Sequence, residues 1–293
     1  MRNTEHKSSW VAAGLLFALL WSSASTATKV GLQVAQPMVI AVSRFALAAL
    51  IMLVYAHVIK RFRLPRGREW GQIAIYGTLN IAVYLGLYVV AMQEVTAGIG
   101  ALAVAVNPVI MSVMAIVLLG KKLESKVVLA LFICLAGVLC TAWPLLGKAE
   151  VTGKGLIVLL ASMFSYSLAA IYFSAKKWDG LHLLTINGWQ TLIGGLVLLP
   201  FLIFFYEPAG NQYTHTFWLA VSWLAVPVSI GAVQLWLWLT SRDTVKAGLW
   251  LFLCPLFGFV IAALLVGEPV SRFTIAGIAL VLGGLFVSRQ QSR

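Results

Sequence analysis

The distribution of charged residues constrains this chain most, because long stretches of the sequence contain no charge. Eight stretches lack Asp, Glu, Lys and Arg: residues 8–28, 70–93, 95–120, 127–147, 155–175, 180–206, 208–241 and 247–267. Residues 273–288 form a shorter stretch of the same kind, and residues 30–59 are interrupted only by Arg44. Since about 20 apolar residues in a helix cross a hydrocarbon core of roughly 30 Å, the pattern predicts ten transmembrane helices joined by short loops.

The composition supports an all-α integral membrane protein and excludes a soluble globular domain. Hydrophobic residues make up 61% of the 293 residues and charged residues only 10%, unlike a typical soluble domain. The short loops leave no room for a catalytic domain outside the bilayer, so we expect one membrane transporter domain over residues 1–293. The first apolar stretch could be a signal peptide, but its removal would leave nine helices, and we favour an uncleaved helix.

The basic residues gather on one side of the predicted membrane topology. With the N-terminus in the cytoplasm, the inner side carries 16 Lys and Arg and the outer side carries four, which are Lys29, Lys148, Lys154 and Arg272. This split obeys the positive-inside rule and predicts that both termini are cytoplasmic in a multi-pass protein of the bacterial inner membrane. The formal net charge of +12 is then explained by topology, so we expect no nucleic-acid partner.

The two halves of the chain repeat each other at a fixed offset. A shift of 147 positions aligns one proline and two glycines with their own kind: Pro108 with Pro255, Gly120 with Gly267 and Gly137 with Gly284. A shift of 146 aligns Arg44 with Gln190. We therefore predict two five-helix repeats, over residues 10–146 and 152–288. Because five is odd, the copies must have opposite orientations, which is the inverted-repeat architecture of secondary transporters.

Further motifs accompany the two halves. Trp21-Ser22 lies in the first predicted helix, Arg44 in the second, a proline in the fourth and ninth, and Gly267-Glu268 after the ninth. With these motifs the chain, over about residues 10–288, resembles the drug/metabolite transporter superfamily, specifically its ten-helix EamA-type exporters. That family often has Glu after the Gly in both halves, whereas this chain has Lys121 in the first. The resemblance implies a central cavity lined mainly by helices 1, 3, 4, 6, 8 and 9. It also implies export of a small metabolite, with amino acids, aromatic ones included, a common substrate class.

Pro108 and Pro255 are predicted near the middle of helices four and nine. A proline inside a helix frees the carbonyl oxygen four residues earlier, and at membrane depth such an oxygen must face protein or a watered cavity. The two prolines could form hinges or polar lining at symmetry-related places, or they could be packing kinks. Asn107 and Trp250 flank them and are candidates for the same lining.

Helix three carries Tyr76, Asn80, Tyr84 and Tyr88 at four-residue spacing, which places the four on one stripe. Because lipid would reject Asn80, we expect this stripe to face the interior, where Asn80 and Tyr84 would line the substrate cavity. For Tyr76 and Tyr88 the alternative is a place in the interfacial aromatic belts.

The other cavity candidates are aromatic and polar residues predicted within helices one, six and eight. They are Trp21, Ser25, Tyr166, Gln234 and Trp238. For hydroxyl residues in helices one and six, the alternative is close helix contact with hydrogen bonds across the interface. Small residues on helix ten, such as Gly277 and Gly283, indicate close contact either within the fold or in a homodimer.

Arg44 is the only formal charge predicted deep inside a helix, where an Arg costs roughly 2.5–3.5 kcal/mol by insertion scales. It could bind a substrate carboxylate, hold freed carbonyls or extend toward the interface, and we favour a structural role. No acidic residue or His is predicted at a helix centre, and the three cysteines lack metal-ligand spacing. We therefore expect no metal and no cofactor, and neutral or zwitterionic solutes fit better than cations or phosphates.

Together these features predict a secondary transporter whose partners are a small-molecule substrate and the lipid bilayer. It would export neutral or zwitterionic metabolites, most of all amino acids including aromatic ones, by alternating access around a midplane cavity. The alternative is a multidrug exporter of lipophilic compounds, which an aromatic and weakly charged cavity would also serve. An enzyme would need clustered His, Asp or Glu at one membrane face, and the sequence predicts none.

Overall fold

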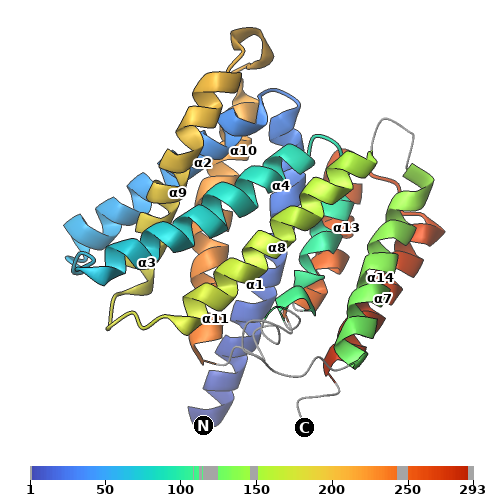
Figure 1. The fold of residues 1–293 in the computed structure, drawn as a ribbon, viewed down its shortest axis with the longest axis horizontal. Coiled ribbons are helices and arrows are strands. Elements are labelled where there is room, and N and C mark those ends of the chain that lie inside the picture. The colour runs from blue at the N-terminus through green and yellow to red at the C-terminus, as the bar shows by residue number, and fades with distance from the viewer. Residues whose placement is uncertain are drawn as a thin grey trace.

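The computed structural model describes residues 2–107, 109–111, 114, 125–145, 151–242 and 250–289, and within these ranges the chain is helical and has no β-strand (Figure 1). The elements of the first half are α1 (Arg2–Leu32), α2 (Pro37–Leu53), η1 (Val54–Ile59), α3 (Arg68–Gly77), η2 (Thr78–Leu85), α4 (Gly86–Ala91), α5 (Ala97–Val104), α7 (Ser125–Ala142) and η3 (Trp143–Leu145). Those of the second half are α8 (Gly153–Ala175), α9 (Leu183–Phe205), η4 (Pro208–Gly210), α10 (His215–Trp223), η5 (Leu224–Ala232), α11 (Val233–Arg242), η6 (Trp250–Leu253), α13 (Cys254–Val266) and α14 (Arg272–Arg289). Pro108 and the turn at Gly120-Lys121 lie outside the described residues.

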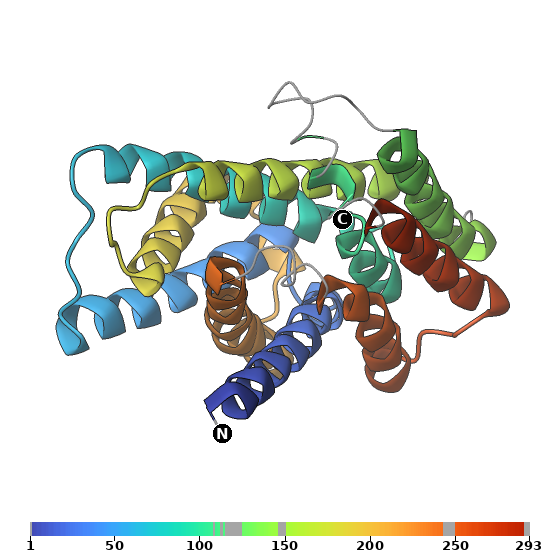
Figure 2. The same ribbon diagram turned by 90° about the horizontal axis from the view of Figure 1, so that it is seen from below.

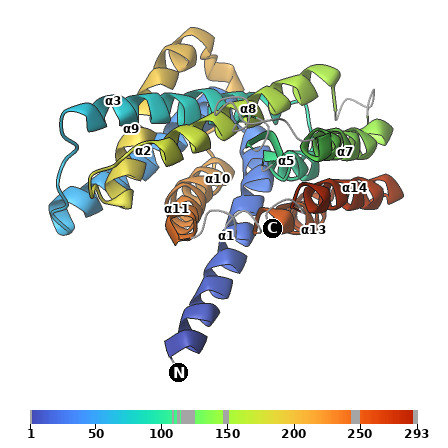
Figure 3. The ribbon, with the colours of Figure 1, turned by 60° about the horizontal axis from the view of Figure 1, so that its bottom comes forward.

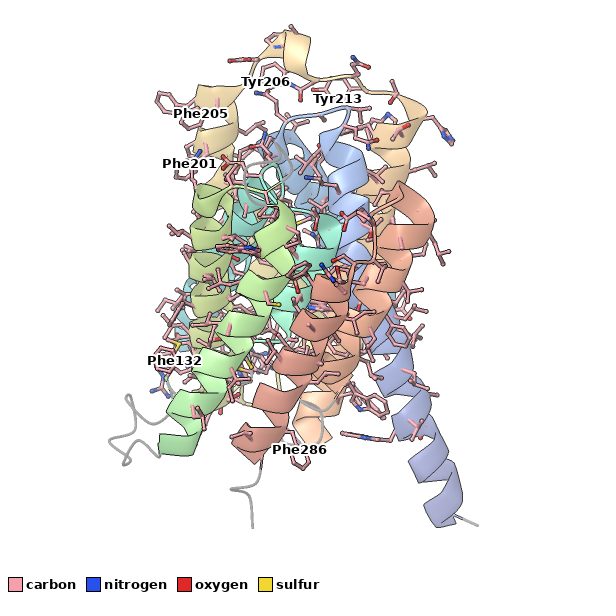
Figure 4. The ribbon with its side chains drawn as sticks, turned by 90° about the vertical axis from the view of Figure 1, so that its right-hand side faces the viewer. Phe132, Phe201, Phe205, Tyr206, Tyr213 and Phe286 are labelled. Atoms are coloured by element: carbon pink, nitrogen blue, oxygen red, sulfur yellow. The ribbon has the colours of Figure 1, made fainter. Side chains whose placement is uncertain are left out.

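Six of the described helices are long and apolar enough to cross a membrane. They are Ser9–Leu32, Pro37–Ile59, Arg68–Ala91, Gly153–Ala175, Leu183–Phe205 and His215–Leu239. Four shorter apolar helices fall in stretches where the sequence predicts further membrane crossings: Ala97–Met111, Phe132–Ala142, Cys254–Val266 and Arg272–Gly284. The outer faces of the helices expose large apolar side chains, including Phe204, which is 85% exposed. Phe201 and Phe205 lie on the outside of the bundle (Figure 4), as expected of a surface that meets lipid.

Local sequence signals explain where several helices begin and end. The hydroxyl of Thr152 accepts a hydrogen bond from the amide of Gly155 at 2.9 Å and caps the first turn of α8. Pro37 lies in the first turn of α2, where the missing N–H would have no helical partner. Gly267 has φ of 69° and ends α13 in the left-handed conformation that glycine adopts without strain.

The element boundaries of the two halves correspond along the chain. α7 and α14 begin 147 residues apart and end 147 residues apart, and the 23-residue helix Pro37–Ile59 lies 146 residues before the 23-residue helix Leu183–Phe205. The equivalent helices Arg68–Ala91 and His215–Leu239 each contain a π-helical segment, η2 and η5. A π-helical segment is rare, so its appearance in both halves is a structural counterpart of the repeat in the sequence.

The helices also pack in corresponding pairs. α2 lies against α9, α5 against α13, and α7 against α14, and the last pair forms one edge of the molecule (Figure 2; Figure 3). α1 packs on η5 and its flanking helices, while α8 packs on η2 and α4. The largest core cluster lies among these contacts and draws residues from α1, the α3–α4 helix, α5, α8, α11 and α13.

One of the two small residues singled out on the last helix, Gly277, packs closely against another helix of the same chain. A Cβ atom placed on Gly277 would lie 1.9 Å from Oγ1 of Thr141 and 2.5 Å from the backbone oxygen of Gly137. A Cβ atom on Gly283, one and a half turns further along α14, would meet no atom within 4 Å. The close contact expected at Gly277 is therefore a contact between α7 and α14 of the same chain.

We expect Gly277→Ala to destabilise the protein, because the backbones of α7 and α14 would have to separate. Overpacking of this kind typically costs about 1–3 kcal/mol and would lower the apparent melting temperature of the purified protein. Gly283→Ala is the matched control on the same helix and should leave that temperature unchanged or raise it, since Ala is the better helix former. Equal melting temperatures for the two variants would contradict the close packing at Gly277.

Candidate functional site

Four aromatic residues from three helices meet in the core and form what we call the aromatic cluster: Trp21, Tyr84, Tyr88 and Tyr166. The ring centroids of Tyr84 and Tyr166 are 4.9 Å apart, those of Tyr84 and Tyr88 6.1 Å, and those of Trp21 and Tyr166 6.2 Å. Each of the four side chains is at least nine-tenths buried. Ser25 joins the cluster through a 2.8 Å hydrogen bond between its hydroxyl and that of Tyr88.

Tyr76 and Tyr88 are buried inside the bundle, so the alternative place in the interfacial aromatic belts is wrong for both. Each is only 5% exposed. Tyr76 packs against the rings of Phe173 and Trp178, and Tyr88 belongs to the aromatic cluster. Four-residue spacing predicts the shared face of these residues, but it does not tell how far the neighbouring helices cover that face.

Four of the predicted cavity residues carry buried polar atoms without a hydrogen-bond partner in the part of the chain that the structure describes. These are the Tyr166 hydroxyl, both amide atoms of Asn107, Nε1 of Trp250 and Oε1 of Gln234. Tyr166 and Trp250 pack in the largest core cluster, as do chain neighbours of Asn107 and Gln234. Because buried polar atoms are nearly always paired, these atoms are available to water or to polar groups of a bound solute.

Trp238 lies in a second row of rings along α1. Its ring centroid is 6.0 Å from that of Trp10, while Phe17 contacts Trp236 at 5.1 Å and Trp21 at 5.7 Å. The indole of Trp250 lies against α1 as well, since a Cβ atom on Gly14 would meet its ring. The structure thus gives Trp238 and Trp250 a common neighbour, α1, but pairs Trp238 with Trp10 rather than with the aromatic cluster.

The expectation that Pro255 lies in the middle of a helix is wrong. Pro255 lies in the first turn of α13, directly after the 3₁₀ segment η6. In the other half α5 ends at Val104, and a turn at Ala105 and Val106 precedes Asn107. In the second half the helix therefore begins at the proline instead of being kinked at it, and Pro255 is well tolerated in a first turn because its missing N–H has no helical partner there.

Arg44 and Asn80 are the ends of a buried chain of hydrogen bonds that crosses four helical segments. Asn80 donates to Oε1 of Gln190 at 3.1 Å, Gln190 donates to Oδ1 of Asn187 at 3.0 Å, and Asn187 donates to the backbone oxygen of Ser229 at 3.0 Å. Nε of Arg44 donates to the Ser229 hydroxyl at 2.8 Å. All five side chains are more than nine-tenths buried. Asn80 thus serves the contact between η2 and α9 and is not part of the aromatic cluster.

Sequence reasoning missed two residues of this chain of bonds. Asn187 and Ser229 carried no signal beyond being polar residues in apolar stretches, whereas Gln190 was marked as the repeat equivalent of Arg44. The π-helical segments η2 and η5 hold Asn80 and Ser229, and such segments often occur at functional sites.

One end of the bundle gathers the loops that the topology predicts on the outer side. Glu268 accepts hydrogen bonds from the amides of Ala97 and Gly98 and so binds the N-terminus of α5, where the helix dipole favours a negative charge. Nζ of Lys29 donates to the backbone oxygens of Met92 and Val95 at 3.0 and 2.7 Å. Tyr206 and Tyr213 lie at this end, and Phe132 and Phe286 lie toward the opposite one (Figure 4).

An ion pair at that end joins the two halves of the chain. Glu94 pairs with Lys154 at 2.9 Å and accepts a hydrogen bond from Thr152. The bond from the Thr152 hydroxyl and the charge of Lys154 lower the pKa of Glu94. Two acidic residues therefore hold this end of the bundle. Glu268, the Glu of the Gly-Glu motif, bonds to the start of α5, and Glu94, which follows α4, bonds to the start of α8.

We expect Ser229→Ala to lower the apparent melting temperature of the purified protein, because it leaves Nε of buried Arg44 without its partner. An unsatisfied buried donor costs about 1–3 kcal/mol. Ser174→Ala is the matched control, because Ser174 is exposed on α8 and its hydroxyl donates to the backbone oxygen of Ala170 in its own helix. If both variants melt at the wild-type temperature, the chain of hydrogen bonds does not hold the helices together.

Comparison with known proteins shows the family to which the sequence belongs. Residues 8–143 and 153–290 each match the EamA-like transporter family. Protein PecM of Dickeya dadantii is 28% identical over 92% of this chain and 88% of its own length. A probable terminal-alkyne amino-acid exporter of Streptantibioticus cattleyicolor is 25% identical over 96% of this chain and 94% of its own.

A solved crystal structure of a protein at 18% identity superposes with a TM-score of 0.69 and covers 98% of both chains, so the fold is shared. The family consists of membrane transporters, and one of the similar proteins is named a probable exporter, in agreement with the resemblance seen in the sequence. With two family matches that together cover nearly its whole length, this chain belongs to the EamA-like transporter family.

Proposed function

We propose that this protein is a secondary transporter that exports small neutral or zwitterionic metabolites, most of all amino acids including aromatic ones. The observation that carries the proposal is the aromatic cluster with its neighbouring unpartnered polar atoms. Rings of Trp21, Tyr84 and Tyr166 provide apolar faces, and the Tyr166 hydroxyl and the Asn107 amide provide donors and acceptors. Such a mixture suits a solute with an apolar side chain and a polar head.

The charges of the core support a neutral or zwitterionic solute. Among the side chains that the structure describes, the buried charged ones are Arg44 and Glu69. Glu69 is held by Arg63 at the start of α3, and Arg44 is bonded to Ser229. We therefore keep Arg44 as a structural charge that joins α2 to η5. The named amino-acid exporter among the similar proteins agrees with this substrate class.

We further propose ten transmembrane helices arranged as two inverted five-helix repeats, 10–146 and 152–288, within one domain over 1–293. The matching element boundaries and the corresponding helix pairs support this arrangement. The loops predicted on the same side of the membrane also bond to one another, as Glu268 does to the start of α5. Both termini would then be cytoplasmic in a bacterial inner membrane, and alternating access would occur by movement of one repeat against the other.

Counterflow in proteoliposomes tests the proposed substrate class. The purified protein should exchange labelled amino acids with saturable kinetics and without an imposed proton gradient, because the one buried carboxylate among the described residues, Glu69, is paired with Arg63 at the start of α3. A panel of aromatic, aliphatic and charged amino acids should show preference for the aromatic ones. Competition by lipophilic drugs but not by amino acids would favour a multidrug exporter, and flux only upon acidification would contradict uncoupled transport.

Tyr166→Phe tests the aromatic cluster directly. It keeps the ring that contacts Trp21 and Tyr84 but removes the unpartnered hydroxyl. If that hydroxyl binds the solute, the KM for counterflow should rise about two- to tenfold, the value of one hydrogen bond, while the melting temperature stays at the wild-type value. Tyr76→Phe is the control, since Tyr76 is equally buried but packs against Phe173 outside the cluster. An unchanged KM in Tyr166→Phe would exclude the hydroxyl from the site.

A further inference from the structure

A pocket of 560 Å³ lies away from the aromatic cluster, between the connection from α2 to α3 and the connection from α8 to α9. Its lining consists of charged residues and one amide: Arg63, Arg66, Arg68, Glu69, Gln72, Lys176, Lys177 and Asp179. The two connections lie at the same corner of the bundle (Figure 1; Figure 2). The topology proposed above puts this corner at the cytoplasmic surface of the membrane.

The pocket carries an excess of positive charge, because five of its lining residues are cations and two are carboxylates. One carboxylate is already used. Glu69 is buried and accepts two hydrogen bonds from the guanidinium of Arg63, at 2.6 and 2.7 Å, and one from the amide of Arg66 at 2.7 Å. The side chains of Arg66, Lys176 and Lys177 are exposed. They line the pocket together with Arg68, and these four cations outnumber the one carboxylate left there, that of Asp179.

The positive-inside rule explains why these residues lie on this side of a membrane, but it does not explain their convergence. Arg63 also donates to the backbone oxygen of Asp179 at 2.9 Å, so it joins two connections that are more than a hundred residues apart in the chain. The Arg63–Glu69 pair thus builds one wall of the pocket. The remaining cations are gathered around a single space instead of being spread along the loops.

Apolar side chains accompany the charges on the same segments. Ile59, Leu64 and Trp70 are 62%, 52% and 36% exposed, and they precede, interrupt and follow the basic run at residues 60–68. A soluble anion would need only the charges. A charged pocket on segments that also carry exposed apolar side chains matches a ligand with an anionic head and an apolar tail.

We propose that this pocket binds the phosphate headgroup of an anionic phospholipid, with phosphatidylglycerol as the probe. Guanidinium groups bind phosphate oxygens in a bidentate manner, and basic pockets at the cytoplasmic surface of membrane proteins bind anionic lipid heads. Arg66, Arg68, Lys176 and Lys177 would hold the phosphate, and the buried Oε1 of Gln72, unpartnered among the described residues, would accept a hydrogen bond from a headgroup hydroxyl. The inference concerns a site apart from the transported solute and holds whichever solute that is.

Native mass spectrometry of the full-length protein tests the proposal. Phosphatidylglycerol should bind the wild type more tightly than phosphatidylcholine with the same acyl chains. Arg66→Gln with Lys177→Gln should weaken phosphatidylglycerol binding about twenty-five-fold, since each basic residue near an anionic lipid surface contributes about a factor of five. The charge-retaining pair Arg66→Lys with Lys177→Arg should keep most of the binding, and it covers the case in which the first pair folds poorly.

Lys60→Gln with Arg61→Gln is the matched control, because it removes two cations from the same connection but outside the pocket lining. This control should bind phosphatidylglycerol as the wild type does. Equal weakening in both pairs would indicate diffuse attraction to the basic surface and would overturn the proposal, as would equal binding of the two lipids by the wild type. If inorganic phosphate displaced phosphatidylglycerol at equal concentration, the ligand would be a soluble anion, and the proposal of a lipid ligand would be refuted.

Discussion

Lipid offers no hydrogen-bond partner, and this constraint governs both the backbone and the interior of the protein. It requires every backbone polar group at membrane depth to be satisfied within a helix or against protein, and the described segments that are apolar enough to cross a membrane are helical. It also requires the polar side chains inside the bundle to bond with one another. The chain from Arg44 through Ser229, Asn187 and Gln190 to Asn80 is the result, and it joins helices of both halves.

The two halves are held together by different physical contacts at different heights. In the interior the contact is the chain of hydrogen bonds between α2, η5, α9 and η2. At the end where Tyr206 and Tyr213 lie, it is the charge of Glu268 on the start of α5 and the pair of Glu94 with Lys154. A transporter that works by alternating access has to break contacts of this kind on one side at a time. The contacts at that end involve partly exposed side chains, which can exchange a partner for water, whereas the buried chain of hydrogen bonds has no such replacement.

Much of the fold could be predicted from the sequence, because the cost of a charge in lipid is a local property. Charge-free stretches mark the helices, and the aligned prolines and glycines mark the repeat, which the two family matches bear out. Helical spacing also predicts that Tyr84 faces inward, and it does. The candidate site was only partly predictable. Spacing predicts the face of a helix but not its partner, so it does not decide between the core and the membrane interface for Tyr88 and gives no signal for Ser229.

The sequence by itself determined that this chain is a helical membrane protein with duplicated halves, because hydrophobic stretches and repeats can be recognised from the order of residues along the chain. Only the tertiary structure decided which residues meet. The sequence predicts Pro255 in the middle of a helix, but in the structure it lies in the first turn of α13. Arg63 binds both the side chain of Glu69 and the backbone of Asp179. Contacts of this kind join residues far apart in the chain, and they depend on the tilt and depth at which helices pack. No local pattern carries that information.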